Sequence, residues 1–118
     1  MDQNITGILF ISALAAYVVW GQIRKRGTAR KVRAAVDGGA LVVDVRTAGE
    51  YASGHYPEAV NVPLDTLQKR SGKLGSKDRA VVVYCASGSR SAQAAALLRR
   101  LGFGNVLNAG ALSSMPPK

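Results

Sequence analysis

Residues 80–91 read Ala-Val-Val-Val-Tyr-Cys-Ala-Ser-Gly-Ser-Arg-Ser, and this stretch constrains the architecture more than any other. Its first five residues form a short apolar run with three adjacent valines, which is typical of a strand buried on both faces. Small residues follow at 86–89, and a helical pattern begins near Ser91. The stretch therefore predicts a buried strand, a tight loop and a helix in succession.

Similar patterns on either side extend this unit. Apolar residues at i, i+3, i+4 and i+7 between 91 and 101 predict a helix that Gly102 ends. Apolar runs predict further strands at 40–45, 59–62 and 105–107. Strands that alternate with helices imply an α/β domain with a mainly parallel central sheet flanked by helices. Such sheets bind ligands at the carboxyl ends of their strands, which is where residue 85 is expected.

An apolar segment at residues 5–23 precedes this domain, which we place at 34–118, and contains no charged side chain. At about 1.5 Å per residue, a helix of this length nearly crosses a hydrocarbon core of about 30 Å. Trp20 lies near its C-terminal end, where aromatic rings favour the headgroup layer. We therefore expect one transmembrane helix, with the short segment 1–4 before it.

The net charge of +9 is concentrated beside the apolar segment. The basic connector at 24–33 has six Lys or Arg and no acidic residue, whereas residues 34–118 contribute only +4. Positive residues stay on the cytoplasmic side of a membrane helix, so we expect the N-terminus outside and the domain in the cytoplasm. Since few aromatic side chains lie elsewhere to stack on bases, the composition does not favour nucleic-acid binding.

Two alternatives compete with the membrane helix. A signal peptide could be cleaved after Ala13-Leu14-Ala15, but residues 1–4 contain no basic side chain and the apolar run continues beyond that site. A buried core helix, apolar on all sides, would need a larger protein to cover it. After the membrane segment, a separate short helix is expected to start with Thr28 as its N-cap and to end at Gly38-Gly39.

Cys85 is the only cysteine, which excludes an internal disulfide framework and a cysteine-cluster zinc site. Backbone N–H groups of the loop after it, together with the positive end of the next helix, can bind an anion and lower the pKa of the thiol. Gly88 allows an unusual backbone conformation, and Arg90 adds a planar cation suited to an oxyanion such as thiosulfate. A lone cysteine is often only a small buried apolar residue, but this loop favours a nucleophile.

Three stretches together resemble the rhodanese-like sulfurtransferase family, over about residues 30–108. Residues 43–51 are similar to its Asp-x-Arg signature followed by a Glu, and residues 54–63 to its Gly-His-x-x-x-Ala-x-Asn-x-Pro segment, with Glu58 where Gly is usual. Residues 85–91 resemble the Cys-x-x-Gly-x-Arg-Ser loop of single-domain members. The chain departs from the family at 108–115, which lacks the usual Gly-Gly and Trp.

This resemblance implies a small rhodanese-like domain and a sulfur-transfer reaction. Cys85 would take a sulfane sulfur from a donor such as thiosulfate, become a persulfide, and pass the sulfur to a thiol or cyanide acceptor. The loop amides and the Arg90 side chain would hold the donor anion and the persulfide. The implied substrate-binding residues are Ala86, Ser87, Gly88, Ser89, Arg90 and Ser91. No cofactor or metal is implied, and the membrane tether suggests a membrane protein partner.

Four other residues of these signatures have two interpretations each. Asp44, Arg46 and Glu50 could line the mouth of the site, but we favour an ion-pair network that fixes the loop. His55, the only histidine, could act as a base, but its place in residues 54–63 favours a structural hydrogen bond.

Two other functions remain alternatives. A non-catalytic rhodanese-like binding or regulatory module would not need the intact loop from Cys85 to Arg90. The other alternative is a small phosphatase or an arsenate reductase. The family's phosphatase relatives use a loop one residue longer, and an arsenate reductase would need a second, resolving thiol.

Overall fold

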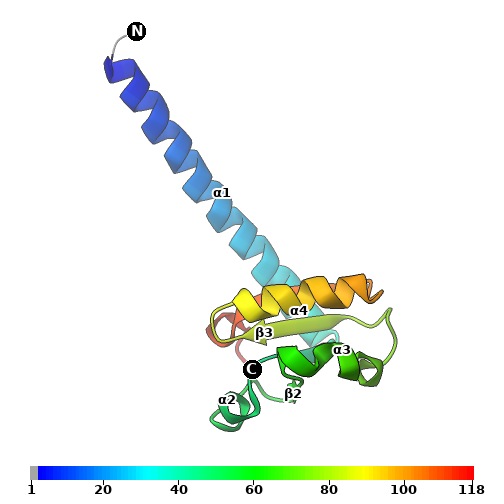
Figure 1. Cartoon of the computed structure of the whole chain (residues 1–118). Coiled ribbons are helices and arrows are strands. Elements are labelled where there is room, and N and C mark those ends of the chain that lie inside the picture. The colour runs from blue at the N-terminus through cyan, green and yellow to red at the C-terminus, as the bar shows by residue number, and fades with distance from the viewer. Residues whose placement is uncertain (1–2) are drawn as a thin grey trace.

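The computed structural model describes residues 3–118 and contains a four-stranded parallel sheet with helices on both faces (Figure 1). The strands lie in the order β2-β1-β3-β4, and every neighbouring pair is parallel. In chain order the helices and strands are α1 (Gln3–Asp37), β1 (Leu41–Asp44), α2 (Ala48–Ala52), β2 (Val60–Asn61), α3 (Leu67–Arg70), β3 (Val81–Cys85), α4 (Ser89–Arg100) and β4 (Val106–Ala111). This arrangement confirms the predicted α/β class and all four predicted strands.

The two faces of the sheet have separate apolar cores because alternate residues of a strand point to opposite sides. On one face, Val43 and Val83 pack with Leu67 of α3 and Leu98 of α4. On the other face, the strand residues pack with the last turns of α1 and with the C-terminal segment. The buried residues of this second core are Val32, Val36, Val42, Tyr56, Ala59, Val82, Tyr84 and Met115.

α1 continues without a break from Gln3 to Asp37, so the predicted separate helix capped by Thr28 is wrong. Residues 24–33 are mostly Arg, Lys and Ala, which favour helix, and they contain no proline to stop it. Gly27 costs only about 1 kcal/mol within a helix, too little to end it. The predicted end is confirmed, because Gly38 donates to the Ala34 carbonyl and Gly39 turns the chain with a φ of 91°.

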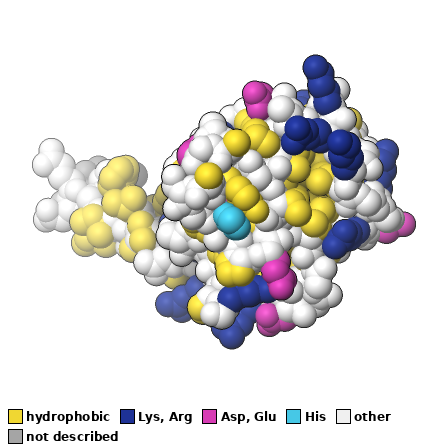
Figure 2. Space-filling view, turned by 90° about the horizontal axis from the view of Figure 1, so that it is seen from below, with side chains coloured by type: hydrophobic (Ala, Val, Ile, Leu, Met, Phe, Trp, Pro, Cys, Tyr) yellow, Lys and Arg dark blue, Asp and Glu magenta, His cyan; other side chains and the backbone are white. Residues whose placement is uncertain are grey.

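The first part of α1 projects from the domain and is exposed along its apolar length, as Figure 2 also shows. Its mean hydropathy of 1.6 over an 18-residue window, none of it buried, gives it the length and composition of a membrane-spanning helix. A membrane anchor and a signal sequence share these properties.

The C-terminal segment is ordered against the second core, although its sequence has no periodicity. Met115 is buried there, and the Tyr56 hydroxyl donates to the Pro116 carbonyl oxygen at 2.8 Å. A short 3₁₀ turn at Leu112–Ser114 connects this segment to β4. The atypical ending therefore still closes the domain beside the carboxyl end of β4.

Candidate active site

Cys85 is the last residue of β3 and is fully buried at the carboxyl edge of the sheet. The Gly88 N–H donates to its Sγ at 2.9 Å, and the Ser91 N–H donates at 3.4 Å. The Ser91 hydroxyl oxygen also lies 3.4 Å from Sγ. Three polar groups of the loop and of the first turn of α4 thus converge on the sulfur atom.

The loop after Cys85 can turn this tightly because two glycines meet there. Gly88 has a φ of 100° and Gly110 a φ of 88°, a region that residues with a side chain rarely adopt. A Cβ on Gly88 would lie 3.5 Å from the Cα of Gly110, so the loop packs directly on β4. Ser91 joins the two, since its hydroxyl lies 3.0 Å from the Gly88 carbonyl oxygen and 3.3 Å from that of Gly110.

These contacts favour the ionised form of the thiol. Burial opposes ionisation of Cys85, but the hydrogen bond with the Ser91 hydroxyl and those from the amides of Ser91, Gly88 and Ser87 outweigh it and lower the pKa. A thiolate is the reactive form of cysteine. The loop therefore favours the form of Cys85 that can act as a nucleophile.

Arg90 forms a bidentate ion pair with Glu50 of α2, with Nη1–Oε1 and Nη2–Oε2 distances of 2.7 and 3.0 Å. About a third of each side chain is exposed. Glu50 also accepts from Thr47 in the capping box that starts α2. The hydrogen bond from Arg90, together with that from the Thr47 amide, lowers the pKa of Glu50 to about 2. Glu50 thus links the signature at residues 43–51 to the cysteine loop. The sequence did not identify Arg90 as the partner of Glu50.

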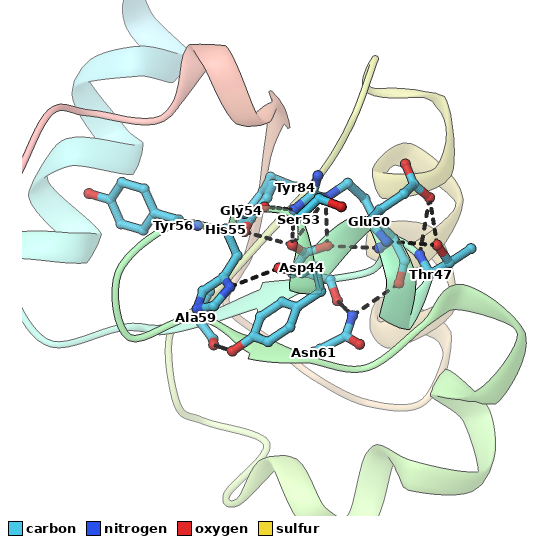
Figure 3. A network of polar contacts seen from close by, with 12 residues as sticks. Asp44, Thr47, Glu50, Ser53, Gly54, His55, Tyr56, Ala59, Asn61 and Tyr84 are labelled. Atoms are coloured by element: carbon cyan, nitrogen blue, oxygen red, sulfur yellow. Dashed lines mark hydrogen bonds and ion pairs between the residues drawn. The ribbon is translucent and has the colours of Figure 1, made fainter.

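Asp44, which Figure 3 shows within a network of polar contacts, forms a second, buried ion pair with Arg46 at the end of β1. Asp44 is fully buried and accepts from the Arg46 guanidinium, the Arg46 amide and the Tyr84 hydroxyl. Arg46 also donates to the Gly54 carbonyl oxygen at 2.7 Å. The expected ion pairs are therefore present, but as two separate pairs.

His55 lies at the surface, where Figure 2 shows the histidine side chain. Its Nδ1 is 2.9 Å from the Tyr51 carbonyl oxygen, and its ring stacks on that of Tyr51 with centroids 3.7 Å apart. This contact agrees with the structural hydrogen bond expected for His55.

The six predicted substrate-binding residues surround Cys85 in the loop and the first turn of α4. Ala86, Ser87 and Ser89 are exposed, Gly88 and Arg90 are half-buried, and Ser91 is buried. Ser91 therefore faces the sulfur, whereas the exposed side chains face solvent.

The sequence analysis missed Tyr84, which lies one residue before the cysteine. Burial raises the pKa of Tyr84 to about 12, so its hydroxyl stays protonated and donates to Asp44 at 2.8 Å. The available signal was a tyrosine among buried valines, because a buried hydroxyl needs a hydrogen-bond partner.

A crevice of about 980 Å³ lies beside the loop, between α1 and the carboxyl end of β4. Ser87 belongs to its lining, together with Asn108, Ala109, Gly110 and Ala111. Its other wall is formed by α1 residues between Tyr17 and Val32. Within residues 3–118, no three His, Cys, Asp or Glu side chains gather in a way that could hold a metal ion.

Known proteins resemble this chain in both sequence and fold. Residues 28–110 match the family described as "Rhodanese-like domain". A protein named "Sulfurtransferase" from Allochromatium vinosum is 47% identical over 68 residues, which are 58% of this chain and 63% of that protein. This chain thus spans less than two thirds of the length of that relative.

Two further relatives cover more of their own length. "Uncharacterized protein YqhL" of Bacillus subtilis is 34% identical over 112 residues, which are 92% of this chain and 87% of that protein. Because residues 28–118 make up less than 92% of this chain, the similarity extends into the part of α1 before residue 28. A solved structure described as "rhodanese with anions from E. coli" has a TM-score of 0.62 at 34% identity, over 66% of this chain and 95% of that one. The chain belongs to the rhodanese-like family.

Proposed function

We propose that the chain is a membrane-anchored sulfurtransferase that carries a sulfane sulfur on Cys85. The observation that supports this most is the convergence of the Gly88 N–H, the Ser91 N–H and the Ser91 hydroxyl on Sγ. These groups can stabilise a thiolate before the reaction and a persulfide anion after it. The relative named "Sulfurtransferase" supports the same chemistry.

The proposed reaction has two displacement steps. The Cys85 thiolate attacks the outer sulfur of thiosulfate, the sulfur–sulfur bond of the donor breaks, and sulfite leaves with the bonding electrons. An acceptor thiolate or cyanide then attacks the outer sulfur of the Cys85 persulfide and leaves as a new persulfide or as thiocyanate. This second step restores the Cys85 thiolate, so the cycle needs no external oxidant or reductant.

The residues after Cys85 would bind the donor. The exposed loop at Ala86, Ser87 and Ser89 would approach the anion, and Arg90 would supply positive charge. Arg90 is already bound to Glu50, so it would use N–H groups that this carboxylate leaves free. A solved relative is described as a rhodanese with anions, which agrees with an anionic donor for this chain.

The membrane part of the proposal rests on the composition of α1. Residues 5–23 would span the bilayer, and the basic connector at 24–33 would hold the domain at 34–118 on the cytoplasmic side. Such a tether would favour sulfur transfer to a partner at the membrane.

The alternative is a non-catalytic rhodanese-like module at the membrane. Two observations favour this alternative. Cys85 is fully buried, and the Arg90 side chain is already paired with Glu50. In such a module the thiol would be part of the apolar core, and the loop would bind a partner.

Intact mass measurement after incubation with thiosulfate tests the proposal. The full chain should gain the mass of one sulfur atom and lose it when a thiol is added, because no second cysteine can resolve the persulfide. The Cys85→Ser variant is nearly isosteric and should fold but gain nothing. A folded wild-type chain that never gains sulfur would support the binding module instead.

A further inference from the structure

The crevice between α1 and β4 places part of the membrane-proximal helix next to the cysteine loop. Ser87 of the loop and residues 108–111 of β4 lie on one side, and α1 residues between Tyr17 and Val32 lie on the other. A molecule in this crevice would therefore lie beside the loop that holds Cys85.

This proximity follows from the direction of α1. The helix ends at Asp37, shortly before β1 begins at Leu41, so its end lies near the amino ends of the strands. Its upstream residues then pass the carboxyl end of β4 and continue away from the domain (Figure 1). The edge of the sheet that carries Cys85 is thus the edge from which the apolar helix projects.

The α1 side of the crevice changes its chemistry along the helix. Tyr17, Val18 and Trp20 are apolar and exposed. Arg24 and Lys25 follow, and the Arg24 guanidinium lies 4.8 Å from the centroid of the Trp20 ring. No acidic residue lines the crevice in the part of the chain that the structure describes. The crevice therefore suits a molecule with an apolar tail and an anionic group next to it.

If α1 is the membrane anchor, the same residues lie at the bilayer surface. Aromatic and basic side chains at the end of a spanning helix are typical of the headgroup layer. Trp20, Arg24 and Lys25 fit this position. The crevice would then open where amphiphilic molecules of the membrane present their polar groups.

We propose that this crevice admits an amphiphilic, anionic thiol from the membrane as the sulfur acceptor, an inference that rests on the proposed function. Its apolar tail would lie along Tyr17 and Trp20, and its anionic group would contact Arg24 and Lys25. Its thiolate attacks the outer sulfur of the Cys85 persulfide, the Cys85 sulfur–sulfur bond breaks, and the acceptor leaves as a persulfide. The Cys85 thiolate is restored, with no net oxidation or reduction.

N-lauroylcysteine and N-acetylcysteine provide a matched pair of probes, because they share the thiol and carboxylate and differ only in the tail. The full chain in phosphatidylcholine vesicles is first loaded with sulfur from thiosulfate. The rate at which each thiol then removes this sulfur is followed by intact mass. The lauroyl compound should react faster, but simple enrichment in the bilayer would also produce this preference.

Variants of α1 distinguish binding in the crevice from simple enrichment of the lauroyl compound in the bilayer. Arg24→Gln/Lys25→Gln should lower the lauroyl-to-acetyl rate ratio by about 2- to 10-fold, the effect of losing two exposed ion pairs. Thr28→Trp, which fills the crevice from α1, should lower it without changing the charge. Arg30→Gln/Lys31→Gln removes the same charge at residues that do not line the crevice, and it should keep the wild-type ratio.

The possible results lead to different conclusions. If Arg24→Gln/Lys25→Gln and Thr28→Trp both keep the wild-type ratio, enrichment in the bilayer explains the preference and the inference is wrong. The same holds if the wild-type chain shows no preference while N-acetylcysteine still removes the sulfur. If thiosulfate never loads the wild-type chain, the proposed function itself fails.

Discussion

Ser91 contacts the Cys85 sulfur through both its hydroxyl and its amide, and both contacts lower the pKa of the thiol. A lowered pKa keeps the thiolate present at a lower pH, and reactivity is lost as the pH falls through that pKa. Ser91→Ala should therefore move the midpoint of Cys85 alkylation by iodoacetamide to higher pH. Ser89→Ala, at an exposed serine of the same turn, should leave it unchanged. An unchanged midpoint in folded Ser91→Ala would show that the backbone amides suffice.

Arg90 has two possible roles, one toward the donor anion and one toward Glu50. If it contacts the anion, Arg90→Ala should lower thiosulfate turnover by about 10- to 100-fold, the effect of losing one charge-assisted hydrogen bond. Glu50→Gln should cost much less, because it keeps Arg90 and removes a negative charge beside the anion. Steady-state rates of both variants make the comparison. Equal losses would mean that Arg90 acts only through the ion pair.

Glu50 itself should contribute little to pH dependence near neutrality. Its pKa is lowered from the ordinary 4.5 to about 2. A carboxyl group with a lowered pKa stabilises the fold above its ordinary pKa, and this stabilisation is lost as the pH falls from about 4.5 toward 2. A change in activity near neutral pH would therefore not come from Glu50.

At the scale of elements, Asp44 joins strands that are distant in sequence. It accepts hydrogen bonds from Arg46 after β1 and from Tyr84 of β3, and the Tyr84 hydroxyl in turn accepts from the Tyr56 amide. Within residues 3–118, no buried side-chain nitrogen or oxygen lacks a hydrogen-bond partner. The Asp44 carboxylate thus connects β1 and β3 at the sheet edge that carries the cysteine loop.

Asp44→Ala should destabilise the domain by about 3–5 kcal/mol, because it leaves the nearly buried Arg46 charge without its partner. Denaturant unfolding would measure this loss, with Asp78→Ala at an exposed position as the control. Asp44→Asn keeps the shape and one acceptor oxygen, so it should cost less. A loss below about 1 kcal/mol in Asp44→Ala would show that solvent reaches Arg46 and replaces the ion pair.

The elements that could be predicted from sequence are those with a local signal. The valine run at 81–83 and the apolar spacing at 94–101 identify β3 and α4 because burial alone determines both patterns. The predicted start of a separate helix at Thr28 was wrong. Thr28 has the chemistry of an N-cap, but the residues before it are already helical. β4 extends to Ala111, beyond the predicted 105–107, because it pairs with β3 through a bulge at Val83/Tyr84.

In the site, too, contacts between residues close in sequence could be predicted, whereas contacts between distant residues could not. Cys85, Gly88 and Arg90 lie close together in the chain, and their spacing predicted a loop around the sulfur. The partner of Arg90 lies 40 residues away, so only the packing of α2 against the loop reveals the Glu50 pair. The crevice beside Ser87 needed the direction of α1 relative to the sheet, which no local pattern contains.

For the whole molecule, the direction of α1 determines what the cysteine edge faces. The longest dimension is 61 Å, and most of it is the projecting helix. In a bilayer, a rigid continuous helix would hold the carboxyl edge of the sheet toward the membrane surface. A flexible connector would not have this effect, so the continuity of residues 24–33 is functionally important in this proposal.

The orientation of that helix is testable through its charges. Because six positive residues lie at 24–33, a reporter fused after Lys118 should be cytoplasmic, and the uncleaved chain should sediment with the membrane fraction. Replacing Arg24, Lys25 and Arg26 by Gln while adding six Lys after Met1 should reverse the charge difference across 5–23 and move the reporter to the outside. Gln at Arg70, Arg99 and Arg100 removes as much charge far from the apolar segment and should change nothing. A mature chain beginning near Ala16 would instead identify residues 5–15 as part of a cleaved signal peptide.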